Sequence, residues 1–204
     1  MLNKPLAAID IGTHTFKLLI ANVIFKPQNN VYSIKELFSQ RVITRLGEGI
    51  SRSRLLRADT LLESISVLKE FRTALNQYDV LSVSAVATSA LRKSRNSDVF
   101  INIVKENTGF DIRIISGDEE AIKTALGMLI DIPIPDTALM VDIGGGSTEL
   151  IFAVNAKPVL IRSIDRGVVH LSARYMKKDP PSARDLHNMD TEITNKLLPI
   201  AKPF

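Results

Sequence analysis

Cysteine is absent from this chain of 204 residues, which excludes a disulfide framework, a thiolate nucleophile and a cysteine-ligated metal site. Tryptophan is absent too, and aromatic residues make up only 5% of the sequence, which argues against a surface for stacking nucleic-acid bases. No apolar run approaches the roughly 20 residues that a membrane-spanning helix needs. Asp10 interrupts the short apolar run near the N-terminus, so no signal peptide is indicated. We therefore expect a soluble cytoplasmic protein that binds neither nucleic acid nor membrane.

The remaining composition is that of an ordinary globular protein. Hydrophobic residues make up 45% and charged residues 24%, which is enough apolar material for a sizeable core. The formal net charge of +4 is compatible with an anionic ligand but does not require one. The length allows one large domain or two small ones. A proline-containing stretch at 132–136 is the expected boundary, with one domain over residues 1–132 and a second over 133–204.

Hydrophobic patterning predicts strands that alternate with helices. Apolar runs predict two strands within residues 6–24, joined by a tight turn, and further strands over 31–38, 80–87, 112–115, 138–142, 149–154 and 158–164. Apolar residues at steps of three and four predict a helix over 57–78. Further helices are expected over 97–107, 118–130, 166–176 and 182–198. This order indicates an α/β fold with mixed sheets.

One short pattern occurs twice. Residues 10–15 read Asp-Ile-Gly-Thr-His-Thr and residues 142–148 read Asp-Ile-Gly-Gly-Gly-Ser-Thr, each between two apolar strands. Such turns expose successive backbone N–H groups to a phosphate oxygen, and glycine permits its close approach. A single copy is equally compatible with a plain hairpin turn, but the duplication favours phosphate binding. The expected phosphate-binding residues of the two turns are Gly12, Thr13, Thr15, Gly144, Gly145, Gly146, Ser147 and Thr148.

The two turns, together with three further motifs, resemble those of the exopolyphosphatase/guanosine pentaphosphate phosphatase (Ppx/GppA) family. The further motifs are RLGEG at 45–49, ATSALR at 87–92 and ISGDEEA at 115–121. The resemblance covers essentially the whole chain. It implies two ribonuclease-H-like lobes of the actin-like ATPase superfamily, with the active site between them. Because family members continue further, it also implies that the second lobe is incomplete here.

The same resemblance implies a Mg²⁺-dependent hydrolase, or one that uses another divalent cation. Its expected substrate is anionic: inorganic polyphosphate, from which water removes the terminal phosphate, or pppGpp, from which it removes the 5′ γ-phosphate. The sequence does not decide between the two. It also leaves the oligomeric state open, a homodimer included.

Several carboxylates are candidates for catalysis. Ser116 to Glu119 fits a helix capping box, so we expect Glu119 to be structural. Glu120 lies about 100° further round the helix, and both this geometry and the family motif make it the expected general base. Glu149 opens an apolar strand, where a buried carboxylate needs a cation or water, so we expect it to position one of them. Together with Glu149, the strand-end residues Asp10 and Asp142 are the expected Mg²⁺ ligands.

The motif at 87–92 supplies the remaining phosphate-binding candidates. The resemblance implies this role for Thr88 and Ser89, and the Arg92 guanidinium can stabilise phosphate charge through two parallel hydrogen bonds. His14 stands where the family usually has asparagine, and we expect a polar turn residue there.

Two other functions remain open at this point. A kinase or ATPase of the same superfamily would use these turns on ATP, and a binding protein would hold nucleotide or phosphate without turnover. A nucleic-acid binder is disfavoured because no basic patch with interleaved aromatic residues is present.

Overall fold

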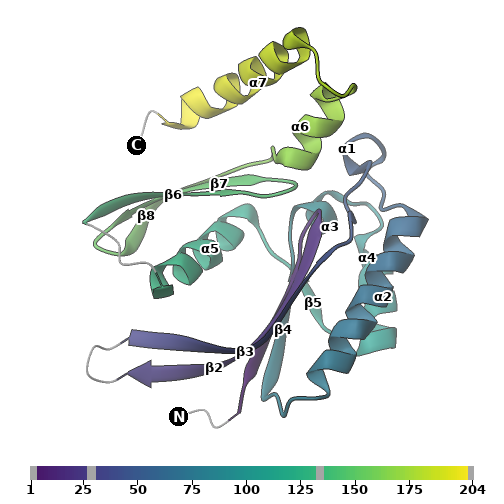
Figure 1. Cartoon of the computed structure of the whole chain (residues 1–204), viewed down its shortest axis with the longest axis vertical. Helices are drawn as coiled ribbons and strands as arrows, with labels where there is room; N and C mark the ends of the chain where they lie inside the picture. Colours follow the sequence, from purple (N-terminus) through teal and green to yellow (C-terminus); the bar gives the residue numbers. More distant parts are fainter. Residues whose placement is uncertain (1–3, 27–30, 132–135, 202–204) are drawn as a thin grey trace.

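The computed structural model describes residues 4–26, 31–131 and 136–201 and contains two β-sheets with helices around them (Figure 1). The strands are β1 (Leu6–Ile11), β2 (Thr15–Lys26), β3 (Val31–Ile43), β4 (Ser82–Ala87), β5 (Ile112–Ile114), β6 (Thr137–Ile143), β7 (Thr148–Val154) and β8 (Lys157–Ile164). The helices are α1 (Ile50–Ser53), α2 (Ala58–Leu75), α3 (Ser89–Lys93), α4 (Ser97–Thr108), α5 (Gly117–Asp131), α6 (Val168–Tyr175) and α7 (Ala183–Ala201).

The first lobe is a five-stranded sheet with helices α1 to α4. Its strand order is β3-β2-β1-β4-β5. Strand β2 is antiparallel to both of its neighbours, β1 and β3, whereas β4 is parallel to β1 and β5 is parallel to β4. Only β2 runs against the others, which is the ribonuclease-H-like arrangement. Helices α2 and α4 pack together on one face of the sheet (Figure 1). Their apolar sides fill the core around Phe16, Leu68, Phe71 and Phe100.

The second lobe is the three-stranded antiparallel sheet β6-β7-β8 with helices α5 to α7. Helix α5 lies between this sheet and the β2–β3 end of the first one (Figure 1), and it buries Ala121 and Ala125 against Met140 and Ile151. The three strands repeat the antiparallel order of β1 to β3. Within the described ranges β6 pairs with β7 alone, whereas β1 pairs with both β2 and β4.

The structure confirms the predicted α/β class and mixed sheet. Every predicted element is present, and the largest difference in bounds is at the end of β3. Strand β3 continues to Ile43 because it pairs along the whole of the long strand β2, and α7 continues through Pro199. The short helices α1 and α3 were not predicted as separate elements. In the part of the chain that the structure describes, no helix has the length and apolar character needed to cross a membrane.

The predicted domain boundary falls mostly on residues 132–135, which lie outside the described residues. The division at this point therefore stays a prediction. Helix α5, which precedes the boundary, packs on the sheet that follows it.

Candidate active site

The two glycine turns are closed by the same main-chain hydrogen bond. In the β1–β2 turn, the Gly12 N–H donates to the Thr15 carbonyl at 3.1 Å, and in the β6–β7 turn the Gly144 N–H donates to the Ser147 carbonyl at 2.9 Å. A Cβ on Gly12 would lie 2.7 Å from the Thr15 carbonyl oxygen, closer than real Cβ atoms approach. The structure thus shows that the sequence repeat is also a repeat in conformation.

The turns also touch each other across the two lobes. A Cβ on Gly146 would lie 2.6 Å from Ser89 Oγ and closer still to Thr13 Oγ1. Both hydroxyl oxygens are buried, and neither has a hydrogen-bond partner in the described part of the chain. Most buried hydroxyls in proteins are paired, so these two are exceptions, and they lie where the two lobes touch.

A cavity of about 300 Å³ opens beside this contact. Most of the predicted site residues line it, namely Asp10, Gly12, Thr13, Thr15, Thr88, Glu120, Asp142, Gly144, Gly145, Gly146 and Ser147. The predicted residues Ser89, Arg92, Thr148 and Glu149 are not part of its lining. The fold therefore brings residues from the two turns, from α5 and from the end of β4 to one place.

Glu120 is the carboxylate whose environment is most altered. It lies in the first turn of α5, where its N–H donates to the Ser116 carbonyl at 3.0 Å. Burial and, to a smaller extent, the charge of Glu149 raise the pKa of Glu120, Arg92 opposes both effects, and the net result is a rise from 4.5 to about 7. A carboxyl with a pKa near neutrality is suited to accepting a proton at physiological pH.

The Arg92 side chain, from α3 in the first lobe, contacts the Glu120 carboxylate on α5. Its Nη1 donates to Glu120 Oε2 at 3.3 Å and to the Ile115 carbonyl at 2.8 Å. Both side chains of the pair are mostly buried, with exposed fractions of 24% for Arg92 and 19% for Glu120. The guanidinium therefore contacts the candidate base, and direct phosphate contact by Arg92 stays a prediction.

Glu119 has the structural role that its capping pattern predicts, with one difference. Its N–H donates to Ser116 Oγ at 3.1 Å, as in a capping box. Its carboxylate does not reach back to Ser116 but accepts two hydrogen bonds from Arg113, at 2.8 and 2.6 Å. The Arg113 side chain offers two donors in one plane, so it takes the carboxylate away from the helix end.

Glu149 and Thr148 follow the second turn at the start of β7 and lie outside the cavity lining. The Glu149 side chain is almost fully buried, its Oε1 accepts from Ser163 Oγ at 2.8 Å, and burial raises its pKa against the effect of this bond. The Thr148 hydroxyl donates to the Arg166 carbonyl at 2.7 Å. Their predicted roles in catalysis, metal binding and phosphate binding stay predictions, and neither side chain lines the cavity.

Asp10 and Asp142 form the acidic side of the cavity. Burial raises the pKa of Asp10, Lys17 at 3.6 Å lowers it, and the neighbouring charge of Asp142 raises it again. Asp142 Oδ2 also accepts from Thr124 Oγ1 at 3.4 Å. Mg²⁺ is commonly held by one or two carboxylates together with water and substrate phosphates, so this pair fits a magnesium ion. Among the described residues, no group of three or more His, Asp or Glu side chains is arranged to hold a metal.

Two cations in the cavity lining were missed by the sequence reasoning. Lys17 on β2 and Arg41 on β3 face each other in the strand register, and Lys17 is also opposite Asp10. The signal was available for Lys17, because a tight hairpin after Asp10 places this lysine beside the strand-end carboxylate. Arg41 depends on the register of a longer hairpin that the sequence does not fix.

Comparison with known proteins places these features in a family. The sequence model of the Ppx/GppA phosphatase family matches residues 23–204. A bifunctional 3-dehydroquinate synthase/phosphatase from Fusobacterium nucleatum is 37% identical over 147 residues, which is 70% of this chain and 22% of that protein.

Solved structures are similar over almost the whole chain. The structure of an exopolyphosphatase from Cytophaga hutchinsonii has a TM-score of 0.89 at 29% identity and covers 98% of this chain and 62% of that protein. The Aquifex aeolicus member of the Ppx/GppA family has a TM-score of 0.76 at 28% identity and covers 97% of this chain and 62% of that protein. This chain therefore spans less than two thirds of the length of these proteins. With its family match over most of the sequence, the chain belongs to the Ppx/GppA phosphatase family.

Proposed function

We propose that this site is the catalytic centre of a phosphatase that removes the terminal phosphate from inorganic polyphosphate. The observation that carries the proposal is Glu120, a carboxyl with a pKa of about 7 in the cavity that the two glycine turns line. The family of the chain supports phosphate ester or anhydride cleavage. The exopolyphosphatase of Cytophaga hutchinsonii supports polyphosphate as the first substrate to test, and pppGpp is the second.

The reaction that these residues support is direct attack by water. Ionised Glu120 accepts a proton from a water molecule, whose oxygen forms a bond to the terminal phosphorus. The bridging P–O bond breaks, and the shortened chain leaves with the bonding electrons. Backbone N–H groups of the two turns and the hydroxyl of Thr13, which lines the cavity, would stabilise the negative charge on the transferred phosphoryl oxygens.

The other residues position these groups. Arg92 keeps the Glu120 carboxylate in one orientation and holds its pKa below the value that burial alone would give. Asp10 and Asp142 would hold a divalent cation, which neutralises charge on the substrate oxygens when bound. Glu149 is hydrogen-bonded to Ser163 and does not line the cavity, so it would act on the metal or the water indirectly.

The test is phosphate release from long-chain polyphosphate, pppGpp and ATP in the presence of Mg²⁺. Glu120→Gln is expected to lower kcat about 100-fold or more, the usual contribution of a general base. Glu119→Gln is the matched control, because it removes a neighbouring carboxylate from the same helix, one whose partner is Arg113 on the surface. We expect this control to keep its activity.

The other results of the same assay identify the alternatives. Release from ATP but not from polyphosphate or pppGpp would indicate an ATP-using enzyme. Binding of these compounds without any release would indicate a binding protein. An equal loss in the two glutamine variants would show that Glu120 has no special part in the reaction.

A further inference from the structure

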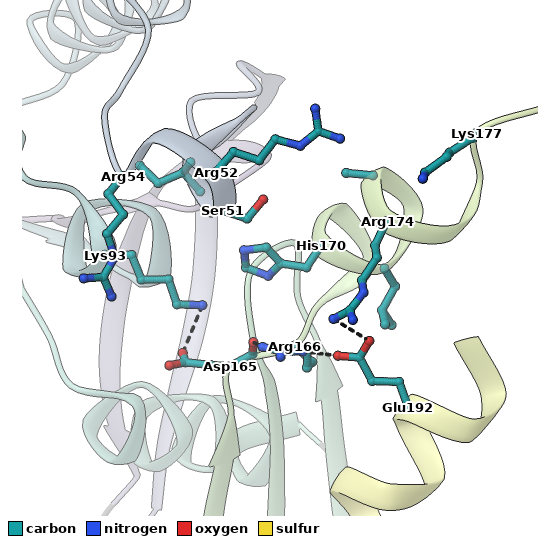
Figure 2. Close-up of a pocket in the computed structure, with 13 residues that line it drawn as sticks. Ser51, Arg52, Arg54, Lys93, Asp165, Arg166, His170, Arg174, Lys177 and Glu192 are labelled. Carbon is teal, nitrogen blue, oxygen red and sulfur yellow. Dashed lines mark hydrogen bonds and ion pairs between the residues drawn. The ribbon is translucent and has the colours of Figure 1, made fainter. Parts of the chain in front are cut away.

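A second cavity, of about 530 Å³, lies between the two lobes (Figure 2). It shares no lining residue with the active-site cavity. The two are separated by the second glycine turn: Gly146 lines the active-site cavity, while its carbonyl accepts from Lys93 Nζ, in the second cavity, at 3.2 Å. The second cavity is therefore next to the active site without being part of it.

The lining of this cavity is strongly cationic. It has six basic side chains, Arg52, Arg54, Lys93, Arg166, Arg174 and Lys177, and two acidic ones, Asp165 and Glu192, so that positive charges exceed negative ones by four. Figure 2 shows that these side chains gather from both sides of the cavity. Like charges held close together repel one another, so this arrangement favours a bound anion.

The two carboxylates neutralise only part of the lining. Lys93 pairs with Asp165 at 3.1 Å. Glu192 is shared by Arg166 at 2.6 Å and Arg174 at 3.0 Å.

Three basic side chains of the lining are not paired with a carboxylate in the part of the chain that the structure describes. Across the described ranges, the side chains of Arg52, Arg54 and Lys177 make no ion pair or hydrogen bond. They are free to contact a ligand.

His170 lies among these cations, as Figure 2 shows. Burial lowers the pKa of His170, and the charges of Lys93 and Arg166 lower it further. Its Nδ1 is buried, and the imidazole interacts with the backbone of Gly146. An anion between these basic side chains would relieve their mutual repulsion.

We propose that this cavity binds a condensed phosphate, an anion of two or more linked phosphate groups. An excess of four positive charges exceeds the roughly two negative charges that one phosphate group carries near neutral pH. Arginine side chains hold phosphate oxygens through paired hydrogen bonds. Of the four arginines in the lining, Arg52 and Arg54 are unpaired within the described ranges, and Arg166 and Arg174 share one carboxylate. The apolar part of the lining is aliphatic (Ile50, Leu171 and Ala173), so it gives no surface for stacking bases.

The bound anion would connect the two lobes. Arg52, Arg54 and Lys93 belong to the first lobe, whereas Arg166, Arg174 and Lys177 belong to the second. A ligand that contacts both groups would favour the arrangement in which the two glycine turns touch. The cavity would therefore regulate the neighbouring site by stabilising this closed arrangement.

The condensed phosphate has two possible sources with the same chemistry. It is either a separate molecule or the distal part of a chain whose end lies between the glycine turns. The number of short ligands bound per protein chain distinguishes them, because a separate site adds a second molecule.

The experiment is calorimetric titration of the chain with tripolyphosphate in the presence of EDTA, so that metal-dependent turnover does not interfere. The double variant Arg52→Ala/Lys177→Ala removes two exposed cations of the cavity. The control Lys69→Ala/Arg184→Ala removes two exposed cations elsewhere and causes the same change in net charge. Because the variant loses hydrogen bonds between charged groups, it should bind tripolyphosphate about tenfold or more weakly than the control.

Each outcome decides the proposal. Two molecules per chain, with one lost in the cavity variant, support a separate ligand, and one molecule with weakened affinity supports a shared chain. Equal affinities of the two double variants would overturn the proposal. Tighter binding of a single-stranded oligonucleotide than of tripolyphosphate would also overturn it, in favour of a nucleic-acid site. Because the measurement is of binding, it stays informative even if the chain does not hydrolyse polyphosphate.

Discussion

Replacing Glu120 with glutamine should stabilise the fold above neutral pH while it removes the candidate base. The reason is the burial of this carboxyl, which raises its pKa from 4.5 to about 7. Only 19% of the side chain is exposed, so water does little to stabilise the charged form. Ionisation of Glu120 therefore lowers the free energy of unfolding of the protein.

The magnitude follows from the link between pKa and stability. A carboxyl with a raised pKa binds its proton more tightly in the folded state than in the unfolded chain. Its stabilising effect is complete below pH 4.5 and is lost as the pH rises from 4.5 to about 7. One pKa unit corresponds to about 1.4 kcal/mol, so the loss amounts to about 3 kcal/mol at pH 8. Glutamine has no proton to lose in this range, and the variant should keep that free energy.

The assay is urea-induced unfolding of the wild-type chain and Glu120→Gln at pH 4 and pH 8. We expect the variant to exceed the wild type by about 3 kcal/mol at pH 8 and to equal it approximately at pH 4. Glu119→Gln is the control, because hydrogen bonds from Arg113 lower the pKa of Glu119, so that its removal gives no gain at high pH. The reasoning is refuted if Glu120→Gln is no more stable than the wild type at pH 8.

Three further changes test other parts of the structure. Arg92→Ala removes the cation that lowers the pKa of Glu120, so the pKa should rise by about one to three pH units, and the acid limb of a kcat–pH profile should move upward with it. Gly146→Ala places a methyl group against Thr13, which should cost about 1–3 kcal/mol in urea unfolding and weaken phosphate binding; unchanged values of both would show that the two turns do not need this contact. Phe71→Ala empties a fully buried position in the first lobe and should lower the free energy of unfolding by about 3–5 kcal/mol, measured in the same way, with a smaller loss indicating that the core collapses around the gap.

The parts of the site that the sequence predicts are those formed by neighbouring residues. A carboxylate, a glycine and two flanking apolar strands specify a turn, and Gly12 and Gly144 make the hydrogen bonds that this pattern requires. The choice between Glu119 and Glu120 was likewise local, because a capping serine three residues before Glu119 assigns that residue to the helix end. Strand and helix positions followed from periodicity for the same reason.

The parts that the sequence does not predict depend on contacts between distant segments. Glu149 opens a strand beside the second turn, yet its position behind that turn depends on Ser163 from β8. The contact of Arg92 with Glu120 depends on how the two lobes meet, which no short motif encodes. The cavity between α1 and α6 arises in the same way, since Arg52 and Arg174 are far apart in the chain.

The bond that closes each glycine turn has a consequence for variation among related sequences. It joins an amide and a carbonyl of the main chain, so the shape of the turn does not depend on the side chains between them. The first turn carries a threonine and a histidine where the second carries two glycines, and both keep the same closure. Substitutions at residues 13 and 14 can therefore alter which ligand is bound while the main-chain hydrogen bond that closes the turn is kept. Selection on specificity should act there, and selection on folding should act on Gly12 and Gly144.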